Sequence, residues 1–474
     1  MKSNKILSGV LLSFLLLVNG CAHLSHQEPL TELKSAPKNL IINNASIITG
    51  KSDDAVFVRN VLIQNGVISQ ITDQAINQEN SHIIDATGQF LMPGLIDFHT
   101  HVTASGAPPW RTTIGKPETN LSAYLASGVT SVVDMGGPLR ELKKWNTEQN
   151  KDNYAYPNLI YAGNIFTVPN GHPHYLISKS SPWPLSWLAR KLVLSTPEST
   201  EDIDQMIQQH KEAGTTFIKV VIDEIPIGSP QFSIKQLQHI VNKSESLGLT
   251  TVAHVGTEKE LIKGIDAGIK LFVHSPYRSA LSKESLNKIK NSKVVIVPTN
   301  VVFDNLADLY ERNLHFSTFE KQIADPILVA SYLSPPEDLE IDPAVDIWFR
   351  QVVKYRQDKI DHVSRFKEAG VTIIAGSDSP NIATFPGSSL HKELQLWVNK
   401  GGMSPKTVIE TATYTSGQQL GLYTKRKVGY VSVGYEADLL LLEKDPSKDI
   451  TATQSIKQVI LGGKIITRKL ANPL

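Results

Sequence analysis

Two histidines separated by one residue close the first long apolar run that follows the N-terminal region, at His99 and His101. Imidazole nitrogen is a natural ligand for zinc and neighbouring divalent ions. Residues two apart on a β-strand point to the same side, so both rings could bind one ion. Such a pair alone is a weak signal of a metal site, and its meaning depends on further ligands that converge on it.

Four more side chains of ligand type stand at the C-terminal ends of later strand-like runs. They are Lys219, His254, His274 and Asp378. Residues this distant in sequence meet at one mouth if their strands are parallel members of a (β/α)8 barrel, because the strand ends of that fold share one face. Any one of these histidines alone is as well explained as a hydrogen-bonded core residue. The set together predicts a metal-dependent hydrolase.

Lys219 needs separate consideration, because an ammonium group has three donors and no lone pair for a cation. A lysine buried beside metal ligands would lose its proton and could take up carbon dioxide as a carbamate, whose oxygens can bridge two metals. From chemistry alone, an ordinary lysine that reaches solvent from a strand end is the simpler interpretation.

The elements that must position these residues alternate between strands and helices. Strand-like runs occupy 95–101, 129–135, 158–166, 215–223, 249–255, 269–275, 293–299 and 371–378. Apolar residues at helical spacing separate most of them, for instance before Gly214 and before Gly248. This order predicts an α/β fold with a distorted (β/α)8 TIM barrel over 93–428. The stretch 301–366 is longer than one crossover needs, and we expect a mostly helical insertion over the barrel mouth.

Short β-like runs also occur at both ends of the chain, over 39–92 and 429–474. Asn65-Gly66 separates two of these runs, which is a strong hairpin signal. Neither stretch is long enough to bury a sheet face alone. Together they predict one small β-sandwich domain built from both ends of the mature chain.

The first residues have the pattern of a leader. Two lysines precede an apolar run from Ile6 to Val18, which has the length of a signal-peptide core and is too short to span a bilayer comfortably. Cys21, the one cysteine of the chain, follows at a position similar to the lipobox of bacterial lipoproteins. We therefore expect a lipoprotein signal peptide over 1–21, lipidation of Cys21 and a polar tether over 22–38. A plain secretory signal with an incidental cysteine is the alternative.

Two features of the composition bear on location and partners. Ala22 follows the cysteine, and by the sorting rule of bacterial lipoproteins it favours the outer membrane, facing the periplasm. Lys plus Arg total 47 against 46 for Asp plus Glu, so the net charge of +1 gives no basic field for nucleic acid. We expect a membrane partner through the lipid anchor, a small-molecule or dipeptide substrate and no nucleic acid. The sequence leaves an oligomer open.

The ligand-bearing segments resemble the amidohydrolase superfamily over nearly the whole mature chain. The resemblance rests on Met92-Pro93-Gly94-Leu95-Ile96-Asp97-Phe98-His99-Thr100-His101, Phe217-Ile218-Lys219, Ala253-His254, Val273-His274 and Gly376-Ser377-Asp378. Lys219 on the fourth strand and His391-Lys392-Glu393-Leu394 are similar to the branch of Xaa-Pro dipeptidases, close kin of imidazolonepropionases. Ser275 after the histidine of the sixth strand and Tyr435-Glu436 near the C-terminus depart from the family pattern. The resemblance therefore does not name the substrate.

The resemblance implies a centre of two divalent metal ions, with zinc as the expected metal. The implied ligands, in chain order, are His99, His101, Lys219, His254, His274 and Asp378. The first two would bind the more buried ion with Asp378, and the later two histidines the second ion. A carboxylated Lys219 would bridge both ions, with a hydroxide between them. Asp378 would take the proton of the attacking group and return it to the leaving amine, so it would also be the acid and base of the reaction.

Three further residues are candidates for contact with the substrate. His172, which follows the third strand, resembles the position where relatives touch the scissile group, so it is a catalytic candidate as well. A separate metal site at His172 and His174 is the competing interpretation. Tyr277 and Arg278 stand just past the sixth-strand histidine; an arginine there could hold a substrate carboxylate bidentately, or be an ordinary solvated residue. The histidines on predicted helices, which we expect at the surface, are His210, His239, His315 and His362.

These observations predict a lipid-anchored amidohydrolase that cleaves an amide C–N bond of a small peptide or N-acyl amino acid by a metal-bridging hydroxide. The reaction would be of the dipeptidase or carboxypeptidase type. A cyclic amidohydrolase of the imidazolonepropionase type, with one metal and no need of the lysine, is one alternative. A lipoprotein that kept the barrel as a non-catalytic binding module is another, and the complete ligand set argues against it.

Overall fold

The computed structural model describes residues 28–151, 153–180 and 182–470. The signal peptide expected over 1–21 and its Cys21 lie outside these residues. Within the described ranges, no helix combines the length and the apolar character needed to cross a bilayer. Residues 31–35, which the sequence placed in the tether, form strand β1 (Thr31–Ser35), and β1 pairs antiparallel with β19 (Lys464–Arg468). The folded domain therefore begins before residue 39.

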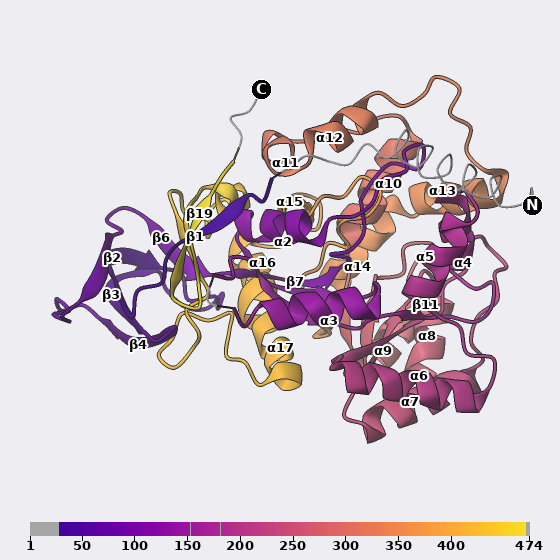
Figure 1. The fold of residues 1–474 in the computed structure, drawn as a ribbon, viewed down its shortest axis with the longest axis horizontal. Coiled ribbons are helices and arrows are strands. Elements are labelled where there is room, and N and C mark those ends of the chain that lie inside the picture. Colours follow the sequence, from indigo (N-terminus) through magenta and orange to yellow (C-terminus); the bar gives the residue numbers. More distant parts are fainter. Residues whose placement is uncertain (1–27, 152, 181, 471–474) are drawn as a thin grey trace, which may run out of the picture.

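A closed barrel of parallel strands forms the larger part of the chain (Figure 1). Its strands are β7 (Leu95–Thr100), β8 (Val129–Asp134), β9 (Asn158–Tyr161) with β10 (Ile165–Phe166), β12 (Phe217–Val221), β13 (Thr250–His254), β14 (Leu271–Val273), β15 (Val295–Val297) and β16 (Thr372–Ile373). Two backbone hydrogen bonds join the separate sheets into a ring, from Thr216 N to Tyr161 O at 3.1 Å and from Phe98 N to Ala375 O at 2.9 Å. The eight strand regions predicted from the sequence are all present, and the α/β barrel is confirmed.

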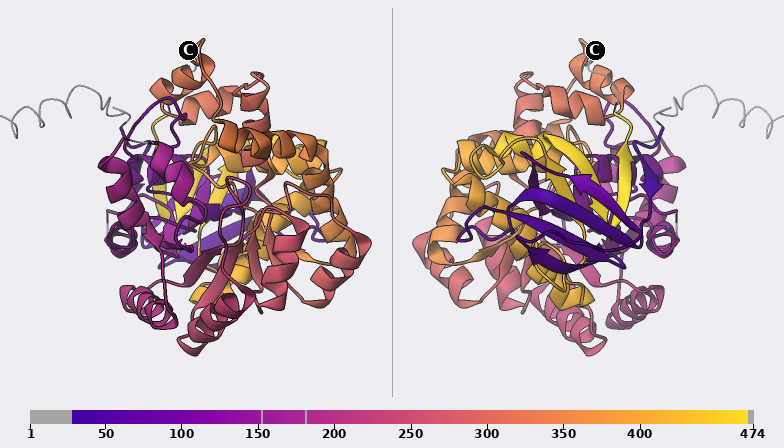
Figure 2. Two further views of the ribbon diagram at one scale, coloured as in Figure 1. Left: turned by 90° about the vertical axis from the view of Figure 1, so that its right-hand side faces the viewer. Right: turned by 90° about the vertical axis from the view of Figure 1, so that its left-hand side faces the viewer.

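Helices surround this barrel (Figure 2). They include α2 (Pro117–Ala126), α3 (Leu139–Glu148), α6 (Thr200–Ala213), α7 (Ile234–Ser246), α8 (Glu258–Asp266), α9 (Lys283–Asn291), α15 (Ser388–Asn399), α16 (Pro405–Glu410) and α17 (Ser416–Thr424). Ser199 and Asp202 satisfy each other's backbone N–H groups at the start of α6, and Gly214 ends that helix with a φ of 86°. Ser233 and Gln236 begin α7 in the same reciprocal way. Local sequence therefore sets where these two helices begin.

Strands from both ends of the chain form one nine-stranded sheet, which faces the viewer on the right of Figure 2. Besides β1 and β19 it holds β2 (Asn39–Ile47), β3 (Phe57–Gln64), β4 (Val67–Thr72), β5 (Ser81–Asp85), β6 (Phe90–Pro93), β17 (Leu439–Leu442) and β18 (Ile456–Leu461). Pairing of β6 with β17 joins the strands of the two chain ends. Asn65 and Gly66 connect β3 with β4 at φ values of 50° and 81°, the left-handed pair that a tight hairpin turn requires.

Strand β17 links this β-domain to the barrel through its two faces. Leu439 and Leu441 pack in the core of the β-domain, whereas Leu440 and Leu442 belong to the large core shared with barrel strands and helices. Successive side chains on a strand point to opposite faces, so all four leucines are buried only because both faces are covered. The polar alternation that a half-exposed strand would show is absent for this reason.

The segment between β15 and β16 is mostly helical, as expected. Its helices are α10 (Asn300–Tyr310), α11 (Thr318–Ile323), α12 (Pro326–Leu333), α13 (Pro343–Lys354) and α14 (Arg356–Ala369). Phe303 of α10 stacks on Tyr277 with ring centroids 3.6 Å apart, and Trp348 of α13 meets the same ring edge-on at 6.0 Å. Two helices of the insertion therefore lie beside the strand ends.

Two of the four histidines expected at the surface are instead buried. His210 lies on the inner face of α6, where its ring meets Phe166 edge-on at 5.0 Å and its Nδ1 donates to the carbonyl of Met206 at 2.7 Å. His362 of α14 is also buried, next to Phe366. Both expectations were wrong because helical spacing alone does not show which face of a polar helix turns toward the barrel.

Candidate metal centre

The candidate ligands stand at barrel strand ends that share one face. His99 lies in β7 and His101 directly after it, Lys219 lies in β12, His254 ends β13, His274 follows β14, and Asp378 follows β16. His274 and Asp378 have φ values of 71° and 57°, a left-handed backbone that is costly for residues other than glycine. This backbone turns the chain sharply at the point where each of these two side chains enters the site.

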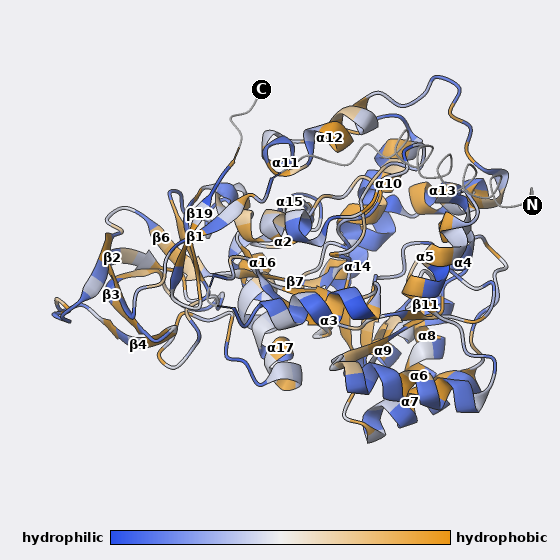
Figure 3. Cartoon of the chain, viewed as in Figure 1, coloured by the Kyte–Doolittle hydropathy of each residue, from blue (hydrophilic) through white to orange (hydrophobic). Residues whose placement is uncertain are grey.

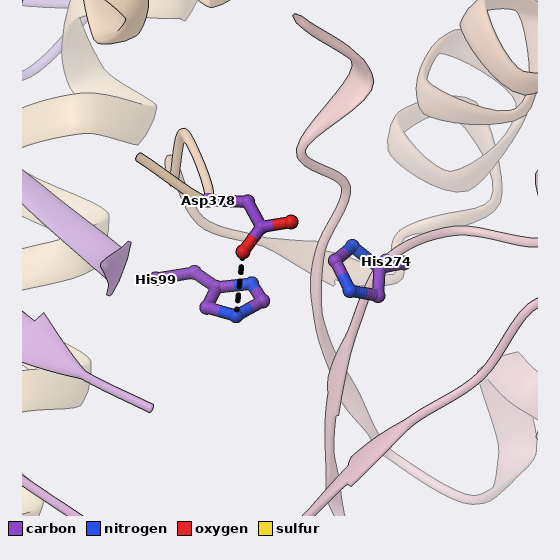
Figure 4. Close-up of side chains that lie close together, drawn as sticks. All are labelled: His99, His274 and Asp378. Carbon is purple, nitrogen blue, oxygen red and sulfur yellow. Dashed lines mark ion pairs between the residues drawn. The ribbon is translucent and has the colours of Figure 1, made fainter. Parts of the chain in front are cut away.

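Asp378 faces the two histidines of β7. Its Oδ1 lies 3.3 Å from Nε2 of His99 and 3.1 Å from Nε2 of His101. Figure 4 shows this carboxylate directed at the His99 ring, with His274 on a separate part of the chain across from them. One ligand atom each from His99, His274 and Asp378 lies within 4.8 Å of the others, and all three residues are buried. These donor types at this spacing suit a divalent ion.

Lys219 is buried at the centre of the group, with 2% of its surface exposed. It shares a strand face with Phe217, which packs in the core inside the barrel. Its Nζ lies 3.4 Å from Nε2 of His99. Burial lowers the pKa of Lys219 to about 7, because the ammonium form loses its hydration. The side chain does not reach solvent, so the simpler interpretation left open by the sequence does not describe this lysine.

His254 and His274 face each other across neighbouring strands. Nδ1 of His254 lies 3.0 Å from Nε2 of His274. Their other ring nitrogens are held by the protein, since Nε2 of His254 lies 2.9 Å from Oδ2 of Asp223 and Nδ1 of His274 contacts the hydroxyl of Thr299. The carboxylate of Asp223 accepts a hydrogen bond from Nε2–H of His254, so the ring keeps its proton on Nε2 and its lone pair on Nδ1, toward His274. Outer partners that fix a ring in this way are typical of metal ligands.

Asp223 contacts three side-chain donors behind this pair, and the sequence analysis missed it. Besides His254, its carboxylate accepts hydrogen bonds from the hydroxyl of Tyr277 and from Nη2 of Arg278. Burial alone would raise the pKa of Asp223, but Arg278 and His254 hold the pKa below its ordinary value, so the group is a carboxylate. The available signal was an acidic residue four positions after Lys219, two residues past the end of β12.

Arg278, the candidate clamp for a substrate carboxylate, is buried in this network. Its Nη2 also reaches Oε1 of Glu260 at 3.2 Å, and its Nη1 donates to Gln351 of α13 at 3.2 Å. Two carboxylates of the protein thus face the guanidinium already, and Tyr277 beside it is fully buried. The Nε of Arg278 is buried without a partner among the described residues, so its N–H is left for another acceptor. Contact of Tyr277 or Arg278 with a substrate stays a prediction.

His172 lies beside the second histidine pair. Its ring centroid is 5.1 Å from that of His254, and its buried Nδ1 has no hydrogen-bond partner among the described residues. Burial lowers the pKa of His172 to about 3, so the ring is neutral at physiological pH. His174 begins α4 (His174–Ser180) and is half-buried. In the part of the chain that the structure describes, neither belongs to a group of three potential metal ligands. A buried imidazole nitrogen without a partner is suited to contact a substrate.

Asp97 is a second residue that the sequence analysis did not single out. It is fully buried, and its Oδ1 accepts hydrogen bonds from the backbone N–H of His99 at 3.2 Å and of Ser377 at 3.0 Å. Its other oxygen accepts from the Ser377 hydroxyl. These bonds hold β7 against the segment that carries Asp378. The sequence signal for Asp97 was an acidic residue inside an apolar strand. A buried carboxyl group needs hydrogen-bond donors, so its presence there indicates that such donors lie beside it.

The group fits a divalent ion in protonation as well as in donor type. Burial lowers the pKa of His99, His254 and His274, so these rings are neutral and carry the lone pair that metal binding requires. Oδ1 of Asp378 is buried, faces two imidazole nitrogens and has no hydrogen-bond donor among the described residues. A buried carboxylate oxygen in that setting needs a positive partner, which a cation would supply.

Comparisons with known proteins agree with this geometry. The profile of the amidohydrolase family matches residues 90–466. Ochratoxinase of Aspergillus niger is 26% identical over 413 residues, which cover 79% of this chain and 75% of the relative. A candidate prolidase from Bifidobacterium longum matches with a TM-score of 0.70 and 21% identity, over 93% of this chain and 97% of its own. A Xaa-Pro dipeptidase with methionine bound in its active site matches with a TM-score of 0.70 and 18% identity, over 90% and 99%. At these identities the two structural matches establish the fold.

Proposed function

This chain belongs to the amidohydrolase family and is a hydrolase of carbon–nitrogen bonds, and on that premise we propose that it cleaves the amide bond of a dipeptide or an N-acyl amino acid. The observation that carries the proposal is the convergence of imidazole, carboxylate and lysine side chains at one end of the barrel. A binding module without catalysis would not need a complete set of buried ligands.

Two divalent ions, zinc first among them, would be held by these side chains. The two histidines of β7 with Asp378 make one set of ligands, and His254 with His274 make the other. Lys219, 3.4 Å from His99, would join the two sets as a carbamate, and its burial supports this role. When bound, such ions lower the pKa of a water molecule and polarise a substrate carbonyl.

The protein side chains would then move protons and hold the substrate. Asp378 Oδ1, which has no hydrogen-bond donor among the described residues, would take a proton from the attacking water and give it to the leaving amine nitrogen. His172 would donate a hydrogen bond to the carbonyl oxygen as negative charge develops there. Phe303, whose ring centroid lies 5.1 Å from that of His274, would keep water from that side of the site.

A small peptide-like substrate with a free carboxylate is the substrate class that we favour. The bound methionine of the similar Xaa-Pro dipeptidase supports an amino-acid-like ligand at this position of the fold. The Nε of Arg278, which has no partner in the described part of the chain, would supply a donor for the carboxylate, close to the His274 ligand.

Substrates that differ only in the C-terminal cap test this class. A dipeptide with a free carboxylate should exceed its amide in kcat/KM by roughly 10- to 150-fold, the equivalent of about 1.5–3 kcal/mol for a charged hydrogen bond. Acetylation of the N-terminus is the matched control and should change kcat/KM little. Equal rates for acid and amide would contradict a carboxypeptidase-like reaction. Turnover of cyclic amides, with no hydrolysis of either the dipeptide or its amide, would support the alternative of the imidazolonepropionase type.

We also propose that the protein is a lipoprotein of the outer membrane, held through Cys21 and facing the periplasm. The pattern of the first residues supports this location. Cells fed a labelled fatty acid should incorporate the label into the parent protein and not into Cys21→Ser, because acylation requires the thiol. Equal labelling of the serine variant would contradict the anchor.

A further inference from the structure

Helix α5 (Leu185–Val193) turns its apolar side away from the core. Its buried residue is Ser186, at 5% exposure, whereas Leu185, Leu188 and Leu192 are each between 47% and 49% exposed. These leucines are spaced three and four residues apart, so they form one stripe along the helix. A surface helix of a soluble domain normally packs such a stripe on the core. The stripe on α5 instead faces outward.

Further apolar side chains extend this stripe along α4 and the connection to α5. The large apolar side chains exposed within residues 176–192 are Leu176, Trp183, Leu185, Trp187, Leu188 and Leu192, and we call this set the α4–α5 face. Trp183 is 79% exposed, more than any other large apolar side chain in the described residues. Figure 3 shows both orange and blue residues along α5. Single exposed apolar residues are ordinary, but a cluster with two tryptophans marks an interaction surface.

The same segment carries positive charge and no negative charge of its own. Over residues 153–197 the sequence has no aspartate or glutamate, while Lys179, Arg190 and Lys191 are basic. Lys179 pairs with Asp342 of the insertion at 3.3 Å. Within the described ranges, no ion pair joins Arg190 or Lys191 to a carboxylate, although Nη1 of Arg190 donates to the Ser178 hydroxyl at 2.6 Å. The positive charges of both side chains are therefore not neutralised by a described carboxylate, and Lys191 is exposed.

We propose that the α4–α5 face docks on the surface of an anionic phospholipid bilayer. Tryptophan and leucine side chains enter the boundary between headgroups and acyl chains, whereas arginine and lysine stay with the phosphates. Trp187 and Lys191 combine both functions within one helical turn, with the ammonium 4.7 Å from the centre of the indole. A second copy of the chain could cover the apolar stripe too, but the basic side chains beside it, which form no ion pair with a described carboxylate, favour a negatively charged surface.

The α4–α5 face lies close in sequence to a residue of the proposed catalytic site. Helix α4 begins two residues after His172, so a bilayer at this face would lie next to the barrel mouth. The anchor expected at Cys21 stands ten residues before the first residue of β1, a span of at most about 36 Å, so it would hold the domain near a membrane. Docking itself depends neither on that anchor nor on the proposed amide hydrolysis.

A fluorescent label on the α4–α5 face tests this inference. In the full chain with Cys21→Ser, the substitution Leu188→Cys gives one thiol on the face, and Leu422→Cys gives one on the exposed side of α17. An environment-sensitive dye on position 188 should become several-fold brighter with phosphatidylglycerol vesicles and change little with phosphatidylcholine vesicles. The dye on position 422 should not respond. Attachment through any other part of the chain would bring both dyes to the vesicle without burying either one.

Charge reversal gives a second measurement. Lys191→Glu should lower the vesicle affinity reported from position 188 by about fivefold or more, since each basic residue near an anionic surface contributes about that factor. Lys425→Glu, an exposed lysine just after α17, is the matched control and should leave the affinity unchanged. Equal responses from positions 188 and 422, or from neutral and anionic vesicles, would overturn the proposal. A response at position 188 that rises with protein concentration without vesicles would overturn it in favour of a second copy.

Discussion

Nε2 of His254 lies 2.9 Å from Oδ2 of Asp223, and this contact decides which nitrogen of His254 faces the centre of the site. Nδ1 then points to Nε2 of His274, 3.0 Å away. The same carboxylate accepts hydrogen bonds from the side chains of Tyr277 and Arg278, which follow His274 in the chain. Asp223 thus orients the His254 ring, and it also holds the segment that follows His274.

Removal of the charge on Asp223 should weaken metal binding. Asp223→Asn keeps the size of the side chain but no longer guarantees a proton acceptor opposite His254, so we expect zinc affinity to fall about 10- to 100-fold. Competition with a chromophoric chelator measures this affinity. Asp204→Asn is the matched control, because that carboxylate contacts His239 at 2.8 Å outside the site. Unchanged affinity in Asp223→Asn would show that the carboxylate does not orient the ligand.

Lys219 is expected to set how many ions the site holds. Five side chains and a carbamate exceed what one tetrahedral zinc uses, so protein prepared with zinc and bicarbonate should contain about two ions per chain. Lys219→Ala should lose metal and activity, and a short carboxylic acid at high concentration should restore part of both by replacing the carbamate. The exposed Lys270→Ala should behave as the parent. A parent ratio that stays near one would favour the mononuclear alternative, and full activity in Lys219→Ala would exclude the bridging role.

The barrel and its ligand positions could be predicted from the sequence because both follow local patterns. Each barrel strand is an apolar run, and each candidate ligand lies in such a run or follows it. A strand buried in a parallel barrel appears in the sequence as a continuous apolar run, so it can be recognised without knowing which distant residues it contacts. The hairpin at Asn65-Gly66 was equally local, since its turn depends on two residues that adopt positive φ.

The residues and strands that the sequence analysis did not predict depend on contacts between distant segments of the chain. Asp97 is held by Ser377, 280 residues further along the chain, and the role of Asp223 depends on the position of Arg278. Strand β1 has little apolar character and is held by backbone pairing with β19, which side-chain patterns do not record. The left-handed backbone of Asp378 likewise has no glycine to mark it in the sequence.

Lys359 of α14 should make stability depend on pH. Its buried Nζ has no hydrogen-bond partner among the described residues, and burial lowers its pKa from 10.5 to about 7. The folded protein therefore binds fewer protons than the unfolded chain between about pH 7 and 10.5, so this lysine makes stability rise with pH across that window. Lys359→Met removes the cost of the buried charge.

The melting temperature of Lys359→Met, compared with that of the parent at several pH values, measures this effect. We expect the variant to melt higher at pH 6 to 7, and the difference to shrink toward pH 10. Lys367→Met, at an exposed position of the same helix, should show no such trend. A difference that does not change with pH would mean that ionisation of Lys359 is not the cause.

The most direct measurement is turnover of a library of dipeptides and N-acyl amino acids by the metal-loaded full chain, with Asp378→Asn beside the parent. We expect the parent to hydrolyse some members and to lose that activity after treatment with a chelator. Asp378→Asn should be slower by about 100-fold or more at a similar melting temperature, because it removes the proposed proton acceptor of the reaction. Asp361→Asn, at an exposed position of α14, should match the parent. No turnover by the metal-loaded parent across the library, or full activity in Asp378→Asn, would contradict amide hydrolysis at this site.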